Sequence, residues 1–206
     1  MFGQIDFLAI LYRVPALLIG LSFHEAAHAY MAYRCGDPTA RNLGRMTLDP
    51  LRHLDLMGTL CLLLVGFGWA KPVPINPRNF KNIRRDEILV SLAGIVTNLI
   101  LAFVFTGVLF FVSRVTTNTI VINLLYYTIF INIALAVFNI IPIPPLDGYH
   151  VLRNSVNGGY QFFSMVERYG RFILIALLLF GVAGRIIGLV GNTIFGLFIS
   201  FFELLF

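Results

Sequence analysis

Phe23-His24-Glu25-Ala26-Ala27-His28-Ala29 lies near the end of the first apolar segment, and the rest of the chain is organised around it. Residues four positions apart on a helix lie one above the other on the same face, so His24 and His28 can reach a single metal ion. Glu25 then faces the water that such an ion holds, where a carboxylate can take a proton during attack on a carbonyl. These seven residues predict a metallopeptidase.

The apolar surroundings of this motif favour a functional interpretation. The H-E-x-x-H pattern also occurs by chance in proteins without metal, so the alternative is a helix that merely caps a membrane segment. Residues 5–21 are almost wholly apolar. Ionisable side chains beside such a run are costly in a bilayer unless they face a partner, a cavity or an ion. We therefore expect the two histidines to bind a metal.

Composition places the whole chain in a membrane. Hydrophobic residues make up 58% of the 206 residues and charged residues only 12%, with a mean hydropathy of +0.85, whereas a soluble domain is about one quarter charged. We expect a single membrane-embedded domain over residues 1–206, with its core at about 5–151. The fifteen Lys and Arg are spread through short loops, and only Arg84 and Arg85 are adjacent. Such spacing sets membrane orientation and argues against a nucleic-acid partner.

The region between the first and third apolar segments is expected to be irregular. The first segment runs from about 5 to 33, and residues 41–48 read as a short strand or strand pair whose edge could pair with an extended substrate. The next apolar run, 54–68, would be about 22 Å long as a helix, which is shorter than a bilayer core. Basic loops flank it on both sides, so we predict a re-entrant or strongly tilted segment with both loops cytoplasmic; the alternative is a plain span.

The loop at 69–85 cannot be one helix, because Pro72, Pro74 and Pro77 interrupt it. It is either a rigid interfacial connector or a wall or gate of the substrate cleft. Beyond it, segments 87–112 and 119–141 are long enough to span.

The third segment carries small residues, among them Gly94, that allow helices to approach closely. Asn98 on the same segment is expected to form an interhelical hydrogen bond. A helical hairpin is expected at about 160–206, where no site is visible. His53 and His150 are expected to be hydrogen-bonding or interfacial histidines.

The fourth segment ends in a second informative stretch. Pro142, Pro144 and Pro145 break the helix in apolar surroundings, which is tolerated where the backbone lines protein or a wet cavity. Asp147 follows at once. It is either a turn residue in an Asp-Gly pair or the third ligand that a two-histidine site still lacks. Because His, His and a carboxylate form an established catalytic zinc set, the first motif favours the ligand.

Four stretches in this order resemble the site-2 protease family of intramembrane zinc metalloproteases, in its compact prokaryotic branch: HEAAHAY (24–30), GWAKPVPINPRNF (68–80), SLAGIVTN (91–98) and FNIIPIPPLDG (138–148). The resemblance implies one Zn²⁺ ion held by His24, His28 and Asp147, with Glu25 as the catalytic acid and base. Asn139 matches a family asparagine that helps to hold the substrate or the oxyanion. Ile95 stands where the family commonly has proline, and no PDZ or CBS module fits into the chain.

The resemblance also sets the expected fold, location and partners. The fold would be an all-α polytopic membrane protein, with a site-2-protease-like helical core and short β-strand or re-entrant elements between the first and third apolar segments. It would lie in a prokaryotic cell membrane with the active site nearer the cytoplasmic side. Its partners would be the lipid bilayer, single-span membrane protein substrates, and an upstream protease or regulatory membrane protein.

Two other functions fit parts of the sequence. A zinc or proton transporter would use intramembrane His, Asp and Glu as a relay, but it would need ionisable groups along several helices, and here they cluster at one depth. A catalytically inactive scaffold that binds membrane helices is disfavoured because Glu25 is intact.

Overall fold

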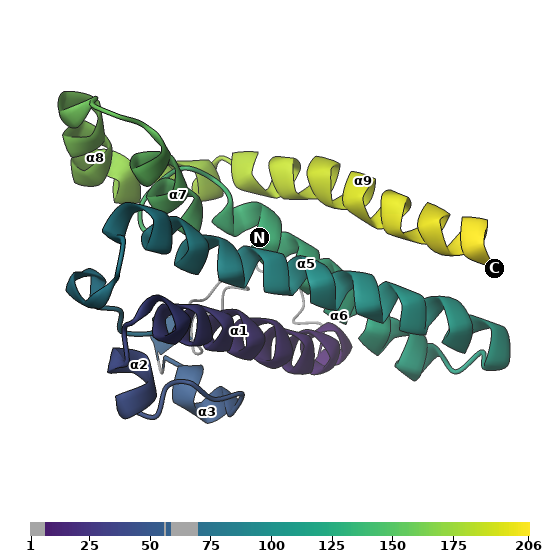
Figure 1. The fold of residues 1–206 in the computed structure, drawn as a ribbon. Coiled ribbons are helices and arrows are strands. Elements are labelled where there is room, and N and C mark those ends of the chain that lie inside the picture. The colour runs from purple at the N-terminus through teal and green to yellow at the C-terminus, as the bar shows by residue number, and fades with distance from the viewer. Residues whose placement is uncertain (1–6, 56, 59–69) are drawn as a thin grey trace.

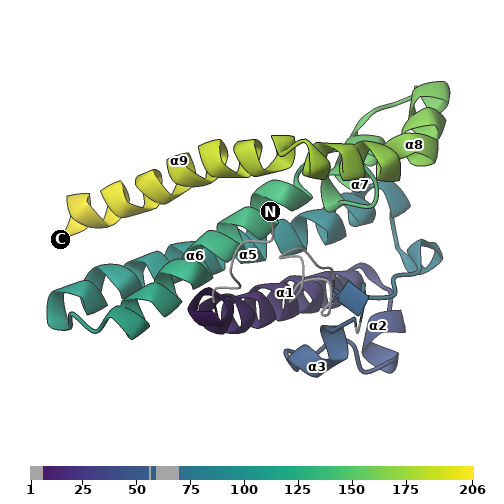
Figure 2. The same cartoon turned by 180° about the vertical axis from the view of Figure 1, so that it is seen from behind.

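Three long helices form the centre of the protein. The computed structural model describes residues 7–55, 57–58 and 70–206. Helices α1 (Phe7–Cys35), α5 (Ile83–Val115) and α6 (Thr119–Asn139) pack against one another, with the end of α1 and the start of α5 at the same end of the bundle (Figure 1). Seen from behind, α9 (Val182–Leu205) lies along α6 on the side away from α1 (Figure 2).

Within the described part, α5, α6 and α9 are long and apolar enough to cross a membrane. At 1.5 Å per residue, the 33 residues of α5 extend about 50 Å, well beyond a hydrocarbon core of about 30 Å. The prediction of a helical membrane protein is therefore confirmed. Helix α1 is not among these three helices, and its 29 residues include Arg13 as well as the ionisable H-E-x-x-H residues.

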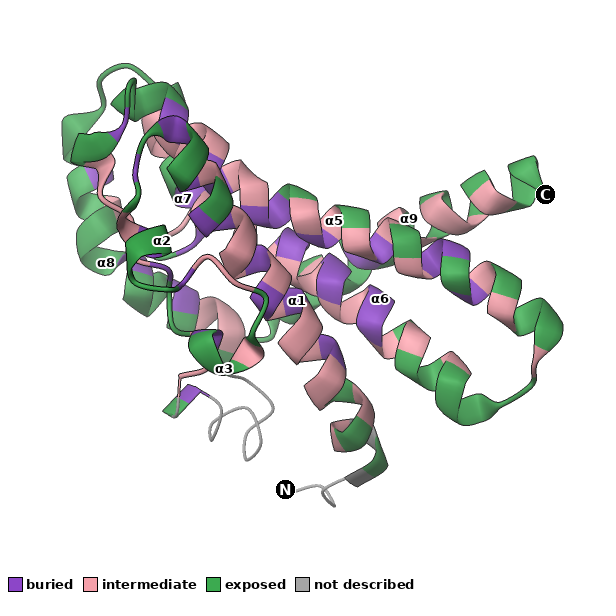
Figure 3. Ribbon diagram, turned by 60° about the horizontal axis from the view of Figure 1, so that its bottom comes forward, coloured by how far each residue is buried: buried purple, intermediate pink, exposed green. Residues whose placement is uncertain are grey.

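Buried residues, purple in Figure 3, gather where α1, α5 and α6 meet. An apolar cluster at the contact of α5 and α6 includes Ala102, Ile129 and Ile133. Fully buried polar side chains lie on the same two helices, among them Asn98 of α5 and Asn132 of α6. A polar group buried in apolar surroundings is tolerated only when it is hydrogen-bonded, so this contact is specified by pairing as well as by packing.

The prediction of a short strand or strand pair at 41–48 is wrong. Residues Thr39–Asn42 form the short helix α2, and Pro50–His53 form α3. The backbone N–H groups of Asn42 and Leu43 donate to carbonyls four residues earlier, and the chain then turns at Gly44 with a φ of +66°. These backbone N–H groups are thus used in local helical hydrogen bonds and are not free to pair with a neighbouring strand. In the described ranges, the one isolated β-bridge joins Leu54 to Ala70. The re-entrant prediction for 54–68 falls largely outside the described residues.

The proline-rich loop is not helical except at η1 (Pro77–Asn79), as predicted. The buried carboxylate of Asp37, just after α1, holds this loop in place. It accepts hydrogen bonds from the backbone N–H of Asn76 and from the amide of Asn79, both at 2.7 Å, and from Thr39. The loop is therefore tied to the end of the helix that carries the two histidines.

The predicted helix break after the fourth segment is confirmed. Helix α6 ends at Asn139, a proline-rich turn follows, and α7 (Asp147–Ser155) begins at the aspartate. Helices α8 (Tyr160–Leu179) and α9 then occupy the region predicted as a hairpin. Helix α9 does not fold back along α8; it leads away from it (Figures 1 and 2), because its apolar surface packs on α6 and α5.

Candidate active site

The structure brings His24, His28 and Asp147 together, although more than 100 residues separate the aspartate from the histidines. The two Nε2 atoms lie 2.9 Å apart, and Oδ2 of Asp147 lies 3.2 Å from Nε2 of His24 and 3.3 Å from Nε2 of His28. Both histidines are buried. The three residues are also a cluster whose ligand atoms could share one metal ion.

The outer nitrogen of each imidazole is occupied by a hydrogen bond. Nδ1 of His28 lies 2.7 Å from the carbonyl oxygen of Val90, which can only accept. Nδ1 of His24 lies 2.6 Å from Oδ1 of Asn98, whose amide nitrogen donates to two other oxygens and so fixes which atom faces the histidine. Both Nδ1 atoms therefore carry the proton, and both Nε2 atoms present a lone pair to the centre of the cluster.

This arrangement fits a zinc ion. Nε2 of each imidazole and the buried Oδ2 of Asp147, which has no hydrogen-bond partner elsewhere, converge on one point. Three such acceptors repel one another unless a cation lies among them. Zinc–nitrogen distances of about 2.0–2.1 Å place tetrahedral ligand atoms about 3.3 Å apart, close to the separations seen here.

Two glycines make room for the cluster. A Cβ atom on Gly94 of α5 would lie 2.6 Å from both His24 and His28. A Cβ atom on Gly148 would lie 2.2 Å from the carbonyl oxygen of Ile140, so only glycine lets the start of α7 approach the end of α6 this closely. The break thereby turns Asp147 back toward α1.

Comparison with known proteins shows the family of the chain. The family model "Peptidase family M50" matches residues 112–181. "Putative zinc metalloprotease YwhC" from Bacillus subtilis (strain 168) is 40% identical over 81% of this chain and 79% of its own length. "Putative zinc metalloprotease Rip2" from Mycobacterium tuberculosis (strain ATCC 25618 / H37Rv) is 30% identical over 90% of this chain and 72% of its own length. The chain belongs to peptidase family M50. No solved structure matches it.

Membership of the M50 family makes the chain a metallopeptidase, with zinc as its metal. It also agrees with the three membrane-capable helices, so this M50 peptidase is an integral membrane protein.

The third polar residue of the motif, Glu25, contacts the proline-rich loop. Its Oε2 accepts a hydrogen bond of 2.8 Å from the backbone N–H of Val73. Pro72 and Pro74 have no N–H to give, so Val73 is the one backbone donor in this tripeptide. Of the two interpretations of the loop, this contact supports a wall of the active site of the M50 peptidase.

The other predicted residues have different surroundings. The amide of Asn139 donates to the carbonyl of Leu135 on its own helix, 3.0 Å away, and its role at the active site stays a prediction. His53 is buried and lies 2.8 Å from the carbonyl of Thr47, as expected of a hydrogen-bonding histidine. The ring of His150 lies against Tyr149.

Sequence reasoning missed two supports of the site. Asn132 on α6 accepts a hydrogen bond of 2.8 Å from Asn98, so α6 braces the residue that contacts His24. An asparagine inside so apolar a helix was an available signal, because polar groups at membrane depth are expensive. Helix α8 also reaches the site region, because the hydroxyl of Tyr149, two residues after Asp147, donates to Glu167 at 2.5 Å.

Proposed function

We propose that this M50 peptidase hydrolyses peptide bonds within the transmembrane segments of single-span membrane proteins. The observation that carries the proposal is the position of the cluster: two buried histidines and a carboxylate lie among α1, α5, α6 and α7, and α5 and α6 are apolar enough to cross a bilayer. A protease centre at that depth reaches chains that are themselves in the membrane.

Glu25 is the proposed acid and base, and His24, His28 and Asp147 the proposed metal ligands. A zinc ion held by these three residues supplies an acidified water and polarises the scissile carbonyl. The Val73 N–H holds one oxygen of the Glu25 carboxylate, which leaves the other oxygen to take the proton of the attacking water. Glu25 then passes that proton to the leaving amine.

The proline-rich loop is the proposed partner of the unwound substrate. Peptide groups of a membrane helix are locked in internal hydrogen bonds, so the helix has to open before a carbonyl can be attacked. The loop runs beside Glu25 and has no helix or strand around Val73, so backbone carbonyls there can accept hydrogen bonds from an unwound chain. Asn139 is the proposed donor to the oxyanion or the substrate backbone.

The distribution of basic residues supports an active site nearer the cytoplasm. Nine of the fifteen Lys and Arg lie between residues 34 and 85, in the segments at the α1–α5 end of the bundle (Figure 1). At the other end of the bundle, the connection between α5 and α6 has one basic residue beside it, Arg114. Basic loops favour the cytoplasmic side. His28 precedes the end of α1 at Cys35 by about 10 Å of helix, so the site lies nearer that side. We also propose that the peptidase acts together with an upstream protease or a regulatory membrane protein.

The test is cleavage of a single-span membrane protein in proteoliposomes by wild type and by Glu25→Gln. Gln keeps the size of the side chain but cannot take a proton, so this variant should retain zinc and lose cleavage. Normal cleavage by the variant would overturn the role of Glu25. Zinc flux into the same proteoliposomes without proteolysis would instead identify a transporter.

A further inference from the structure

Basic side chains surround a hollow at the start of α5. The hollow has a volume of about 310 Å³. Arg34 from the end of α1, Lys81 from the loop and Arg85 from the first turn of α5 line it, together with the apolar side chains of Met31 and Leu89. Three cations from three segments thus line one hollow, and Met31 and Leu89 form what we call its apolar floor.

The cations of this hollow keep their charge, and Arg34 also donates a hydrogen bond of 3.0 Å to the hydroxyl of Tyr30. In the part of the chain that the structure describes, no carboxylate lies within ion-pair distance of Arg34, Lys81 or Arg85. The hollow contains one acidic residue, Asp86, which is buried and accepts a hydrogen bond from the backbone of Asn82. The lining therefore carries an excess of positive charge.

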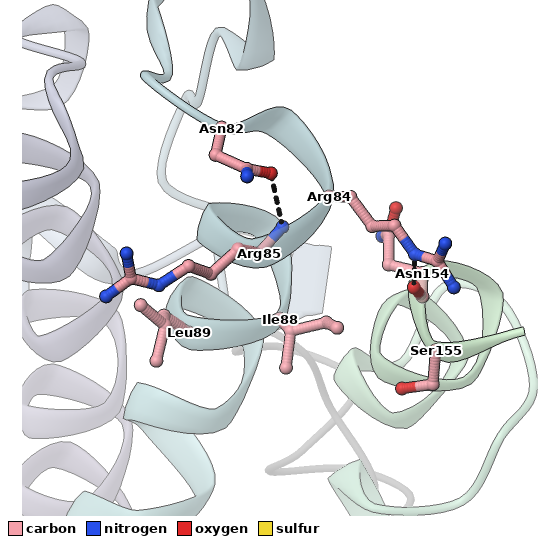
Figure 4. A pocket seen from close by; sticks show the side chains of 7 residues that line it. All are labelled: Asn82, Arg84, Arg85, Ile88, Leu89, Asn154 and Ser155. Carbon is pink, nitrogen blue, oxygen red and sulfur yellow. Dashed lines mark hydrogen bonds between the residues drawn. The ribbon is translucent and has the colours of Figure 1, made fainter.

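The neighbouring arginine has a different role. A second hollow of about 460 Å³ lies between α5 and α7 and shares Asn82, Arg85 and Leu89 with the first. Figure 4 shows Arg84 and Arg85 pointing to opposite sides of α5, with Arg84 directed at α7. Arg84 donates to the carbonyl of Asn154 and to Asn157. Arg84 thus ties α7 to α5, whereas Arg85 is left for a ligand.

The depth of the hollow matches the headgroup layer of a bilayer. Helix α5 exceeds the thickness of the hydrocarbon core by about 20 Å, so part of it extends beyond the hydrocarbon. Its apolar run begins at Ile88, after the four charged residues Arg84, Arg85, Asp86 and Glu87, so the start of α5 lies outside the apolar stretch. A soluble anion would need only the cations. A phospholipid would also use the apolar floor.

We propose that the hollow bounded by Arg34, Lys81 and Arg85 binds the headgroup of an anionic phospholipid, with the phosphate among the three cations and the acyl chains directed along α5. Basic pockets between membrane helices bind such headgroups through charge-assisted contacts. This site lies outside the hydrolytic cluster, and no step of the proposed reaction depends on it.

The test is native mass spectrometry of the purified full chain in neutral detergent, titrated with phosphatidylglycerol or phosphatidylcholine. Wild type should bind phosphatidylglycerol at least about tenfold more tightly than phosphatidylcholine. At about 1 kcal/mol for each cation near a lipid surface, Lys81→Gln with Arg85→Gln should weaken phosphatidylglycerol binding about 30-fold. The charge-preserving pair Lys81→Arg with Arg85→Lys should retain it.

The matched control removes two exposed arginines of α8, Arg168→Gln with Arg171→Gln, and should change the affinity less than threefold. Equal affinity of wild type for the two lipids would overturn the proposal, as would an equal loss in the control. Displacement of phosphatidylglycerol by a hundredfold excess of inorganic phosphate would show that the hollow recognises free phosphate and would overturn the lipid assignment. Unchanged melting temperatures show that the variants are folded.

Discussion

Asn98→Ala tests how the site holds its metal. Asn98 is fully buried and makes three contacts: its Oδ1 accepts from His24, and its amide nitrogen donates to the carbonyl of Gly20 at 3.0 Å and to Asn132 at 2.8 Å. The substitution leaves the Nδ1–H of His24 without an acceptor, so the imidazole loses its fixed orientation. Loss of such an outer contact costs about 10–100-fold in metal affinity, or about 1.4–2.7 kcal/mol.

The assay is competition for zinc between the purified protein and a chelator of known affinity. The matched control is Asn132→Ala, because Asn132 is equally buried and bonds to Asn98 but does not contact His24. Each variant leaves buried groups unpaired, at about 1–3 kcal/mol for each group, so melting temperatures should fall in both. Zinc affinity should fall at least about tenfold in Asn98→Ala and much less in Asn132→Ala, where the carbonyl of Gly20 still holds the Asn98 amide. Equal zinc affinities for the two variants would refute the reasoning.

Three further predictions concern other contacts of the site. Val73→Pro removes the N–H that holds Glu25, and we expect it to lower kcat at least tenfold with zinc still bound. Val73→Ala keeps the N–H and should keep the wild-type rate. Equal kinetics of the two variants would show that the loop takes no part in the mechanism. Gly94→Ala places a Cβ atom 2.6 Å from both histidines and should abolish zinc binding in metal analysis, unlike Gly188→Ala on α9, where the Cβ atom meets nothing within 4 Å. Burial would raise the pKa of Asp37, but the hydrogen bonds from Asn76, Thr39 and Asn79 outweigh it and lower the pKa. The stability that the ionised Asp37 carboxylate contributes is therefore fully present above its ordinary pKa of about 4. It is lost as the pH falls through the lower pKa that Asp37 has in the folded protein. Asp37→Asn should melt lower at pH 7 and show a weaker loss of stability in acid, and an unchanged acid profile would contradict this role.

The sequence predicted the parts of the fold that depend on local chemistry. Helical spacing and the cost of ionisable groups in apolar surroundings were enough to pair His24 with His28. Proline chemistry was enough to end the fourth segment before Asp147. The meeting of these two parts, across more than 100 residues, was expected from the ligand set that zinc requires, and the structure brings them within 3.3 Å.

The errors and omissions arise where tertiary contacts decide. The segment at 41–48 alternates well enough for a strand, but helical bonds beginning at Pro38 use its first donors. The contact of Val73 with Glu25 and the brace from Asn132 join residues 48 and 34 positions apart. No local periodicity encodes such pairs. The course of α9 likewise depends on its packing against α6.

Anomalous diffraction at the zinc absorption edge, from crystals of the zinc-loaded protein, tests the central claim most directly. We predict one anomalous peak at about 2.0–2.2 Å from Nε2 of His24, Nε2 of His28 and Oδ2 of Asp147. A peak bound elsewhere, or no peak among these three atoms in zinc-loaded protein that cleaves its substrate, would contradict the account.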